Sequence, residues 1–123
     1  HSACDDSSRA VSTGQLRIAK GANGSNASQI FRNLLLSPDA RAESIPELEV
    51  LADDVSAAHG AASAPIDPEQ LFYLESRGLD PDAAQHLVVE GFLIAAMQEL
   101  GSGKLFDWLR GRLTIHLDCA LLE

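Results

Sequence analysis

The sequence predicts a mixed β and α chain, with strands stacked as coils in the first half and a small helical domain after them. Aliphatic residues recur every sixteen positions at Ile18, Leu34 and Val50, and Ile66 stands at the next step. Apolar and polar residues alternate over much of the first 55 residues, as in half-buried strands, whereas beyond residue 66 apolar residues recur at helical spacing. Aromatic residues make up only 5% of the 123 residues, and a core of aliphatic and small side chains suits a repetitive structure.

Three strands are expected in the first half, over Gln15–Ala19, Gln29–Ser37 and Ala42–Ala52. The first ten residues show neither a helix nor a strand period and are expected to form a cut end or a disordered lead-in. The unbroken run of three leucines from Leu34 indicates that the second strand is covered on both faces. Pro46 fits the third strand only near its start or at a sheet edge. In that strand the residues expected to point inward are Leu48, Val50 and Ala52. The constant spacing is typical of stacked coils, as in a β-solenoid, and an ordinary antiparallel meander stays open.

Two start signals open the helical half. Asp67-Pro68-Glu69-Gln70 places an acid at the N-cap and proline at the first helical position, and Asp80-Pro81 repeats the signal after Gly78. The second helix is expected to run to Leu100, with a neighbouring backbone close to Gly91. A third helix is expected over Lys104–Leu122, with leucine at every fourth position as a core stripe: Leu105, Leu109, Leu113, Leu117 and Leu121.

Charge and hydropathy exclude two classes of partner. The net charge of −9 repels a nucleic-acid backbone and an anionic membrane. No apolar run approaches the roughly 20 residues that a membrane span needs. We therefore expect neither partner, and a cytoplasmic location, or the plastid stroma if the organism has plastids.

Candidate ligands are few. His59 stands alone among alanines and glycine between the strand and helix patterns, where it either binds a metal or simply ends the last coil. Asp53 and Asp54 are consecutive and face opposite sides of a strand, so a turn suits them better than a paired acid site. Cys4 and Cys119 lie far apart in the sequence, and their spacing signals neither a zinc site nor a disulfide framework.

Several ordered motifs resemble one family. The strings QIFRNLLLSPDARAESIPELEVLADDVSAAHGAA and IDPEQLFYLESRGLDPDAAQHLVVEGFL look like the C-terminal part of the SufB/SufD family, the scaffolds of the SUF machinery that assembles iron–sulfur clusters. Where SufD-type members read C-S-H-G-A-T, this chain has Ala57-Ala58-His59-Gly60-Ala61-Ala62. The place of the functional cysteine in SufB-type members falls at Phe31. The chain is therefore SufD-like, and only His59 of the ligand set is retained.

The resemblance implies the C-terminal coils of a right-handed parallel β-helix over residues 1–63 and a helical C-terminal domain over 64–123. It implies a non-catalytic scaffold, not an enzyme, which binds a SufC-type ATPase and pairs with a SufB-type partner or with itself. An iron–sulfur cluster or iron, shared with that partner, would use His59 as metal ligand. The candidates for partner contact in the helical part are Phe72, Tyr73, Arg77, Phe92 and Trp108; exposure of Trp108, as an interface anchor, would favour a docking role over a core role.

Two alternatives remain at this point. Other β-helix proteins are polysaccharide lyases and hydrolases, and in such an enzyme Asp53, Asp54 and His59 would be the acid and base candidates. A degenerate scaffold that has lost the cluster chemistry would explain the absent cysteines.

Overall fold

The computed structural model describes residues 1–120, and of Glu99 and Ala120 it describes the backbone alone. The chain divides into two compact units, Ser2–Ala64 and the chain from Pro65 on. The strands lie in the first unit and the helices in the second. None of the described helices is both long and apolar enough to cross a lipid bilayer.

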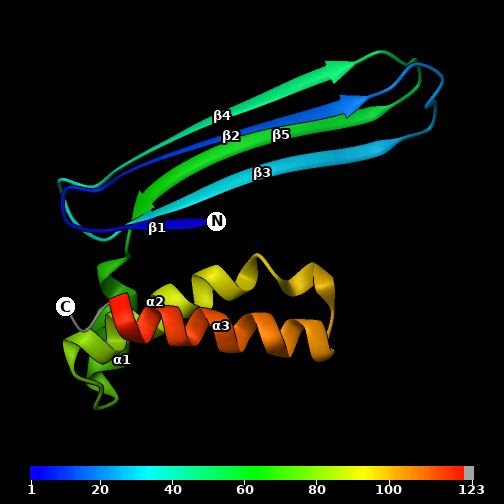
Figure 1. The fold of residues 1–123 in the computed structure, drawn as a ribbon. Helices are drawn as coiled ribbons and strands as arrows, with labels where there is room; N and C mark the ends of the chain where they lie inside the picture. Colours follow the sequence, from blue (N-terminus) through cyan, green and yellow to red (C-terminus); the bar gives the residue numbers. More distant parts are fainter. Residues whose placement is uncertain (121–123) are drawn as a thin grey trace. The chain divides into compact units, whose positions relative to one another are not determined.

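The first unit consists of strands that alternate between two sheets (Figure 1). Strands β1 (Ser2–Cys4), β3 (Asn26–Leu35) and β5 (Ser56–Pro65) form one sheet, and β2 (Arg9–Ile18) and β4 (Arg41–Val50) form the other. The chain therefore crosses from one sheet to the other at every turn. The strands that pair are parallel, which rules out the antiparallel meander.

The register explains the sixteen-residue interval. Ile18 pairs with Val50 and Leu16 with Leu48, so partners in this sheet are 32 residues apart, twice the interval seen in the sequence. One interval thus corresponds to one strand and its turn, and two intervals return the chain to the same sheet. Leu34, midway between Ile18 and Val50, lies in the opposite sheet and is buried, as is Ile18.

Three expectations about the strands need correction. The first ten residues are not without structure, because Ser2–Cys4 pairs with β3 and buries Cys4. The alanine-rich run after Val55 is a ten-residue strand, β5, rather than a junction. Both segments gain their backbone partners from residues about 30 positions away, which a local pattern does not reveal. Leu48 and Val50 lie in register with Leu16 and Ile18 but stay 38% and 40% exposed, so they are not core residues among the described strands.

Pro46 sits in the middle of β4, opposite Gly14 of β2. A proline has no N–H for the ladder and is tolerated there because β4 has only β2 as a neighbour in the described sheet. The expectation of an edge strand is confirmed. On the outer face of this sheet, Arg17 Nε lies 2.9 Å from Glu49 Oε2, and these two residues are register partners.

The second unit starts with two capped helices, α1 (Pro68–Ser76) and α2 (Pro81–Ala95). The Asp67 carboxylate accepts from the Glu69 N–H and the Asp80 carboxylate from the Ala83 N–H, each at 2.9 Å. Gly78 has a positive φ of 98° just after α1, as expected of a helix stop. The two predicted helix starts are confirmed.

Two predictions for the later helices are wrong. The second helix ends at Ala95, and a 3₁₀ turn (η1, Gln98–Leu100) follows it. Nothing lies within 4 Å of a Cβ built at Gly91, so no neighbouring backbone explains that glycine. The third helix, α3, spans Lys104–Ala120, and the last two predicted positions lie outside the described residues.

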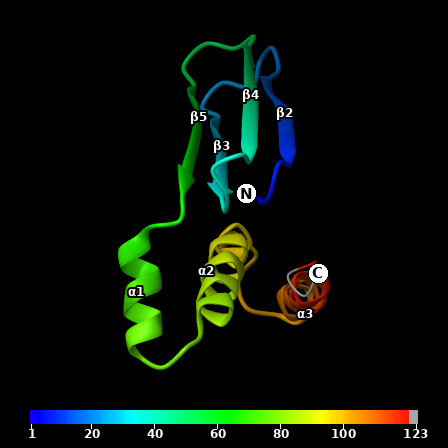
Figure 2. The same ribbon diagram turned by 90° about the vertical axis from the view of Figure 1, so that its left-hand side faces the viewer.

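The helices are loosely packed. α2 contacts both α1 and α3, and Figure 2 shows the three in that order. Side chains also join α2 to α3: the Thr114 hydroxyl donates to Glu90 Oε1 at 2.9 Å, and His86 Nε2 lies 3.6 Å from Asp118 Oδ1. In this unit the described apolar residues that are buried are Ala84, Val89 and Leu117. The leucine stripe is only partly core, since Leu117 is buried and Leu105 is 58% exposed.

Candidate cluster ligand and partner surface

The site around His59 is built by β5. Side chains alternate along a strand, so Ala57, His59, Ala61 and Ser63 share one face. Ser63 identifies this face, because its hydroxyl accepts from Asn33 Nδ2 at 2.9 Å and Asn33 is only 5% exposed. The face therefore points toward the inside of the strand unit.

His59 nevertheless remains exposed. Within the described sheet β5 is the outermost strand, flanked only by β3, and the residues on either side of His59 along this face are alanines. Small neighbours and an open flank leave the imidazole accessible to an incoming group. The small neighbours are also what makes this histidine stand out in the sequence.

A pocket of about 360 Å³ surrounds His59, lined by residues 28–32 of β3 and 58–62 of β5. Its charged or amide side chains include Arg32 and Gln29, and Phe31 adds an aromatic wall. This size is at the low end of the range for small-molecule sites. The pocket admits a small group or a partner side chain, and its lining residues include no carboxylate.

Asp53 and Asp54 lie apart from this pocket. They occupy the turn between β4 and β5, where Asp54 adopts a φ of 52° and its carbonyl accepts from the Gly24 N–H at 2.8 Å. The aspartates therefore shape a turn and are absent from the lining of the His59 pocket. The structure does not bring together the three residues that an enzyme was expected to use.

Metal-binding side chains do not cluster in residues 1–120. No group of three or more histidine, cysteine, aspartate or glutamate residues in this range is placed to hold a metal ion. Cys4 is buried in β1, and Cys119 is exposed on α3. On the strand unit, His59 is thus a single candidate ligand without companions in its pocket.

Aromatic side chains are exposed on α1. Phe72 is 73% exposed and Tyr73 is 56% exposed, and the Arg77 guanidinium lies over the Tyr73 ring, 5.3 Å from its centroid. A cation above a ring is weakly attractive and restrains both side chains. The structure therefore brings Tyr73 and Arg77 together, and it leaves Phe72 free to meet a partner.

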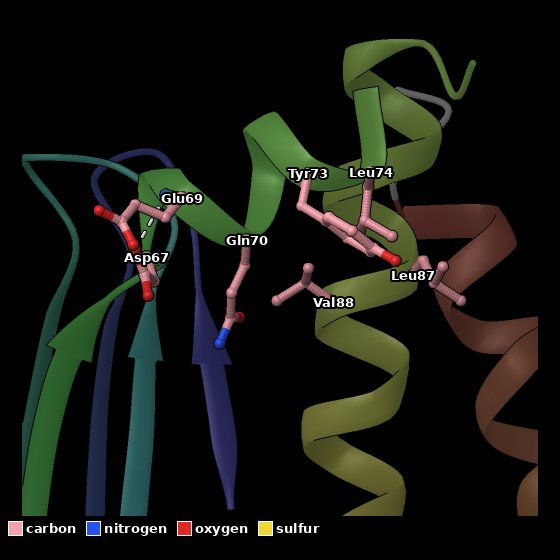
Figure 3. A pocket seen from close by; sticks show the side chains of 7 residues that line it. All are labelled: Asp67, Glu69, Gln70, Tyr73, Leu74, Leu87 and Val88. Atoms are coloured by element: carbon pink, nitrogen blue, oxygen red, sulfur yellow. Dashed lines mark hydrogen bonds between the residues drawn. The ribbon is translucent and has the colours of Figure 1, made fainter. Parts of the chain in front are cut away.

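A second pocket separates α1 from α2 within the helical unit (Figure 3). Tyr73 and Leu74 of α1 reach toward Leu87 and Val88 of α2, and the polar side chains at the start of α1 border the other end. Leu87 is 46% exposed, so the floor of this pocket is apolar and open.

The remaining two partner candidates differ in exposure. Phe92 of α2 is half-buried, whereas Trp108 of α3 is 62% exposed. Around Trp108, the exposed positions at steps of three and four include Leu105, Arg112 and Ile115, which lie on one face of α3. Exposure of the tryptophan favours a docking role for this face over a core role.

The strongest interior interactions were not anticipated in detail. Asn33 bridges three strands: Ser2 Oγ donates to its Oδ1 at 2.7 Å, and its Nδ2 donates to Ser44 and Ser63. Gln29 was not singled out at all, yet its Oε1 is buried and has no partner among the described residues. Both residues occupy strand positions that alternate toward the interior, and this alternation is the sequence signal that could have identified them.

Comparison with known proteins identifies the family. A family model described as SUF system FeS cluster assembly, SufBD core domain, matches residues 1–92. The chain belongs to the SufBD core family. The match covers the strands and reaches into α2, so His59, Phe72, Tyr73, Arg77 and Phe92 lie inside it and Trp108 lies outside.

Curated relatives agree with this membership. The iron-sulfur cluster assembly SufBD family protein slr0076 of Synechocystis is 35% identical over 115 residues, which is 94% of this chain and 24% of the relative. The iron-sulfur cluster assembly protein SufD of Bacillus subtilis is 41% identical over 100 residues, 81% of this chain and 23% of the relative. Protein ABCI7, chloroplastic, of Arabidopsis thaliana is 35% identical over 104 residues, which is 85% of this chain and 22% of the relative. The chain spans about a quarter of the length of these relatives.

The residues of this SufBD chain do not fit a complete cluster site. An iron–sulfur cluster is held by four protein ligands, usually cysteine thiolates, with histidine as a known replacement. Among the described residues the pocket offers one imidazole, and Ala57 stands on the same face where a thiolate would be needed. A cluster at His59 would need ligands from outside the described residues.

Proposed function

We propose that the chain is part of a non-catalytic, SufD-like scaffold that acts in iron–sulfur cluster assembly. The SufBD core match over residues 1–92 carries the proposal. The parallel strands with a 32-residue register support coils of a right-handed β-helix over residues 1–63, followed by a helical domain over 64–123. The location we propose is the cytoplasm, or the stroma in an organism with plastids.

In this proposal His59 is one ligand of a cluster or iron site shared with a SufB-type scaffold, or with a second copy of the protein. Support comes from its exposure on the open flank of β5 and from the small residues beside it, which let a second chain approach. Neutral imidazole is a suitable ligand for iron. The remaining ligands, thiolates above all, would come from the partner.

Replacement of His59 tests this role. In the intact protein, His59→Ala should impair cluster assembly with the partner without unfolding the protein, because an exposed side chain contributes little packing. His116→Ala is the matched control, since His116 is an exposed histidine on α3. Undiminished assembly by the His59→Ala protein would remove the histidine from the site and would favour a degenerate scaffold without cluster chemistry.

The helical unit is proposed to bind a SufC-type ATPase. Phe72 and Trp108 are large, exposed aromatic side chains, and Arg77 is restrained against Tyr73. Tryptophan, tyrosine and arginine are frequent anchors of protein interfaces, and losing an anchor costs at least about 2 kcal/mol of binding. A tenfold change in affinity corresponds to about 1.4 kcal/mol, so the loss should be readily measured.

The binding test compares single substitutions in the whole chain. Phe72→Ala and Trp108→Ala should each weaken capture of a purified SufC-type ATPase, and Val11→Ala should not. Val11 is a suitable control because it is 55% exposed on β2, away from the helices in the sequence. Equal capture of all three variants would exclude the proposed surface.

No observation favours the enzyme alternative. It requires Asp53 or Asp54 beside His59 in an open groove, and the lining residues of the His59 pocket include neither.

A further inference from the structure

We propose that Gln29 is a positioning residue for His59: its buried side-chain oxygen accepts a hydrogen bond from one ring N–H of His59 and leaves the other ring nitrogen free to bind. The inference extends the proposed role of His59 as a ligand and depends on that role for its importance. The evidence is the position of Gln29 within the strand unit.

The two residues are neighbours across β3 and β5. Asn33 of β3 binds Ser63 of β5, thirty residues further along the chain. The Ser56 N–H donates to the Ser25 carbonyl at 2.9 Å, the bond that a parallel ladder makes when partners are thirty residues apart. The same offset sets His59 beside Gln29, on the same face, and both line the same pocket.

The amide of Gln29 is held in place by the opposite sheet. A Cβ built at Gly14 would lie 2.0 Å from Gln29 Nε2 and 3.0 Å from Phe31 Cζ, so the glycine on β2 makes the room that this amide occupies. Gln29 Oε1 is buried there and has no partner among the described residues. A buried carbonyl oxygen without a donor is rare in folded proteins and destabilising.

His59 is the side-chain donor that the ladder of β3 and β5 places next to Gln29. On the same face the adjacent residues of β3 are Ala27 and Phe31, and those of β5 are Ala57 and Ala61. None of these four side chains carries an N–H or O–H group. In the proposed arrangement, the exposed His59 ring turns toward Gln29 and satisfies the oxygen.

Such a contact has a chemical consequence. A neutral imidazole has one N–H and one lone pair, and the acceptor that holds the N–H decides which nitrogen is left to bind. Metal-binding histidines commonly donate their other ring N–H to an oxygen, which fixes both ring orientation and tautomer. Gln29 would supply that oxygen from within this chain before any partner arrives.

The tautomer of His59 tests the proposal without reading cluster assembly. Long-range ¹H–¹⁵N spectra of metal-free protein labelled with ¹⁵N-histidine, at one fixed pH where the ring is neutral, show which nitrogen carries the proton. We expect a single tautomer in the unmodified protein, its signals assigned by their loss in His59→Ala. Gln29→Met, which keeps length but removes the acceptor, should shift both nitrogens toward the values of a tautomer mixture.

Further variants separate positioning from a structural effect. Gln29→Glu keeps an oxygen at this place and should restore the single tautomer, and Gly14→Ala, which displaces the amide, should abolish it. Gln15→Met on the exposed side of β2 is the matched control and should change nothing. Identical His59 signals in the unmodified protein and in Gln29→Met would overturn the proposal.

A crystal structure of the unmodified protein gives an independent answer if a variant fails to fold. A ring nitrogen of His59 within hydrogen-bond distance of Gln29 Oε1 supports the inference, whereas a bound water or other group on that oxygen in place of the ring refutes it. Neither the tautomer nor the crystal structure depends on a bound cluster. Failure of this inference would therefore not refute the proposed role in cluster assembly, which the His59→Ala experiment tests separately.

Discussion

Removing the Asn33 side chain should destabilise the strand unit more than any other single polar change among its described residues. Asn33 is 5% exposed, and its amide makes three side-chain hydrogen bonds, to Ser2 at 2.7 Å, Ser63 at 2.9 Å and Ser44 at 3.0 Å. These partners belong to β1, β5 and β4, so one side chain joins strands of both sheets.

The expected magnitude follows from these bonds. A hydrogen bond contributes about 1 kcal/mol net to stability, so Asn33→Ala should lower the free energy of unfolding by about 3 kcal/mol. Asn33→Leu, which retains volume, should lose nearly as much, because the serine hydroxyls still lose their partner. Ser63→Ala removes one of the three bonds and should cost about 1 kcal/mol.

Urea unfolding monitored by circular dichroism measures these differences as shifts in the midpoint at constant slope. Asn26→Ala is the matched control, since Asn26 is exposed at the start of β3 and should change stability by no more than about 0.5 kcal/mol. If Asn33→Ala lost no more than Asn26→Ala, the bridge between the sheets would not support the unit, and the reasoning would be refuted.

Three smaller effects are expected in the same assay. Val89 is 1% exposed, so Val89→Ala should cost about 2 kcal/mol through lost burial and a residual cavity, whereas Leu87→Ala, at a site that is 46% exposed, should cost less. Asp80→Ala removes the N-cap of α2 and should cost about 1 kcal/mol, and Asp80→Asn should recover most of it. Arg17→Ala breaks the exposed ion pair with Glu49 and should lower the free energy of unfolding by less than about 1 kcal/mol. In 1 M salt, which screens the pair, the variant and the unmodified protein should be equally stable.

The stacking of the strands left a signal in the sequence, the even spacing of aliphatic residues, although this spacing alone did not exclude an antiparallel meander. Ile18, Leu34 and Val50 mark successive crossings between the sheets, and their even spacing reflects a turn of nearly constant length. The helix starts were predictable for a different reason. An aspartate followed by proline satisfies backbone donors locally, and no tertiary contact is needed to favour it.

The first and last of the described strands were not predictable in the same way. β5 consists mainly of alanine, serine and glycine, which lack strand preference, and β1 is only three residues long. Each exists because β3 offers it a backbone ladder, so their structure depends on residues far along the chain. This limit also affects the candidate site: His59 was expected at a junction, as a metal ligand or as the end of the last coil, and it lies on a strand with Gln29 beside it.

The position of His59 on a strand supports a role as a shared ligand more strongly than the residues around it in the sequence do. A histidine in a flexible junction would have to be ordered at the moment of binding, and that entropy would weaken the site. On β5 the backbone is already fixed by β3, and only the ring torsions remain to be set. If Gln29 fixes those as well, the chain presents one preorganised imidazole on an open flank, which is what a scaffold needs if the rest of the ligands arrive on another protein.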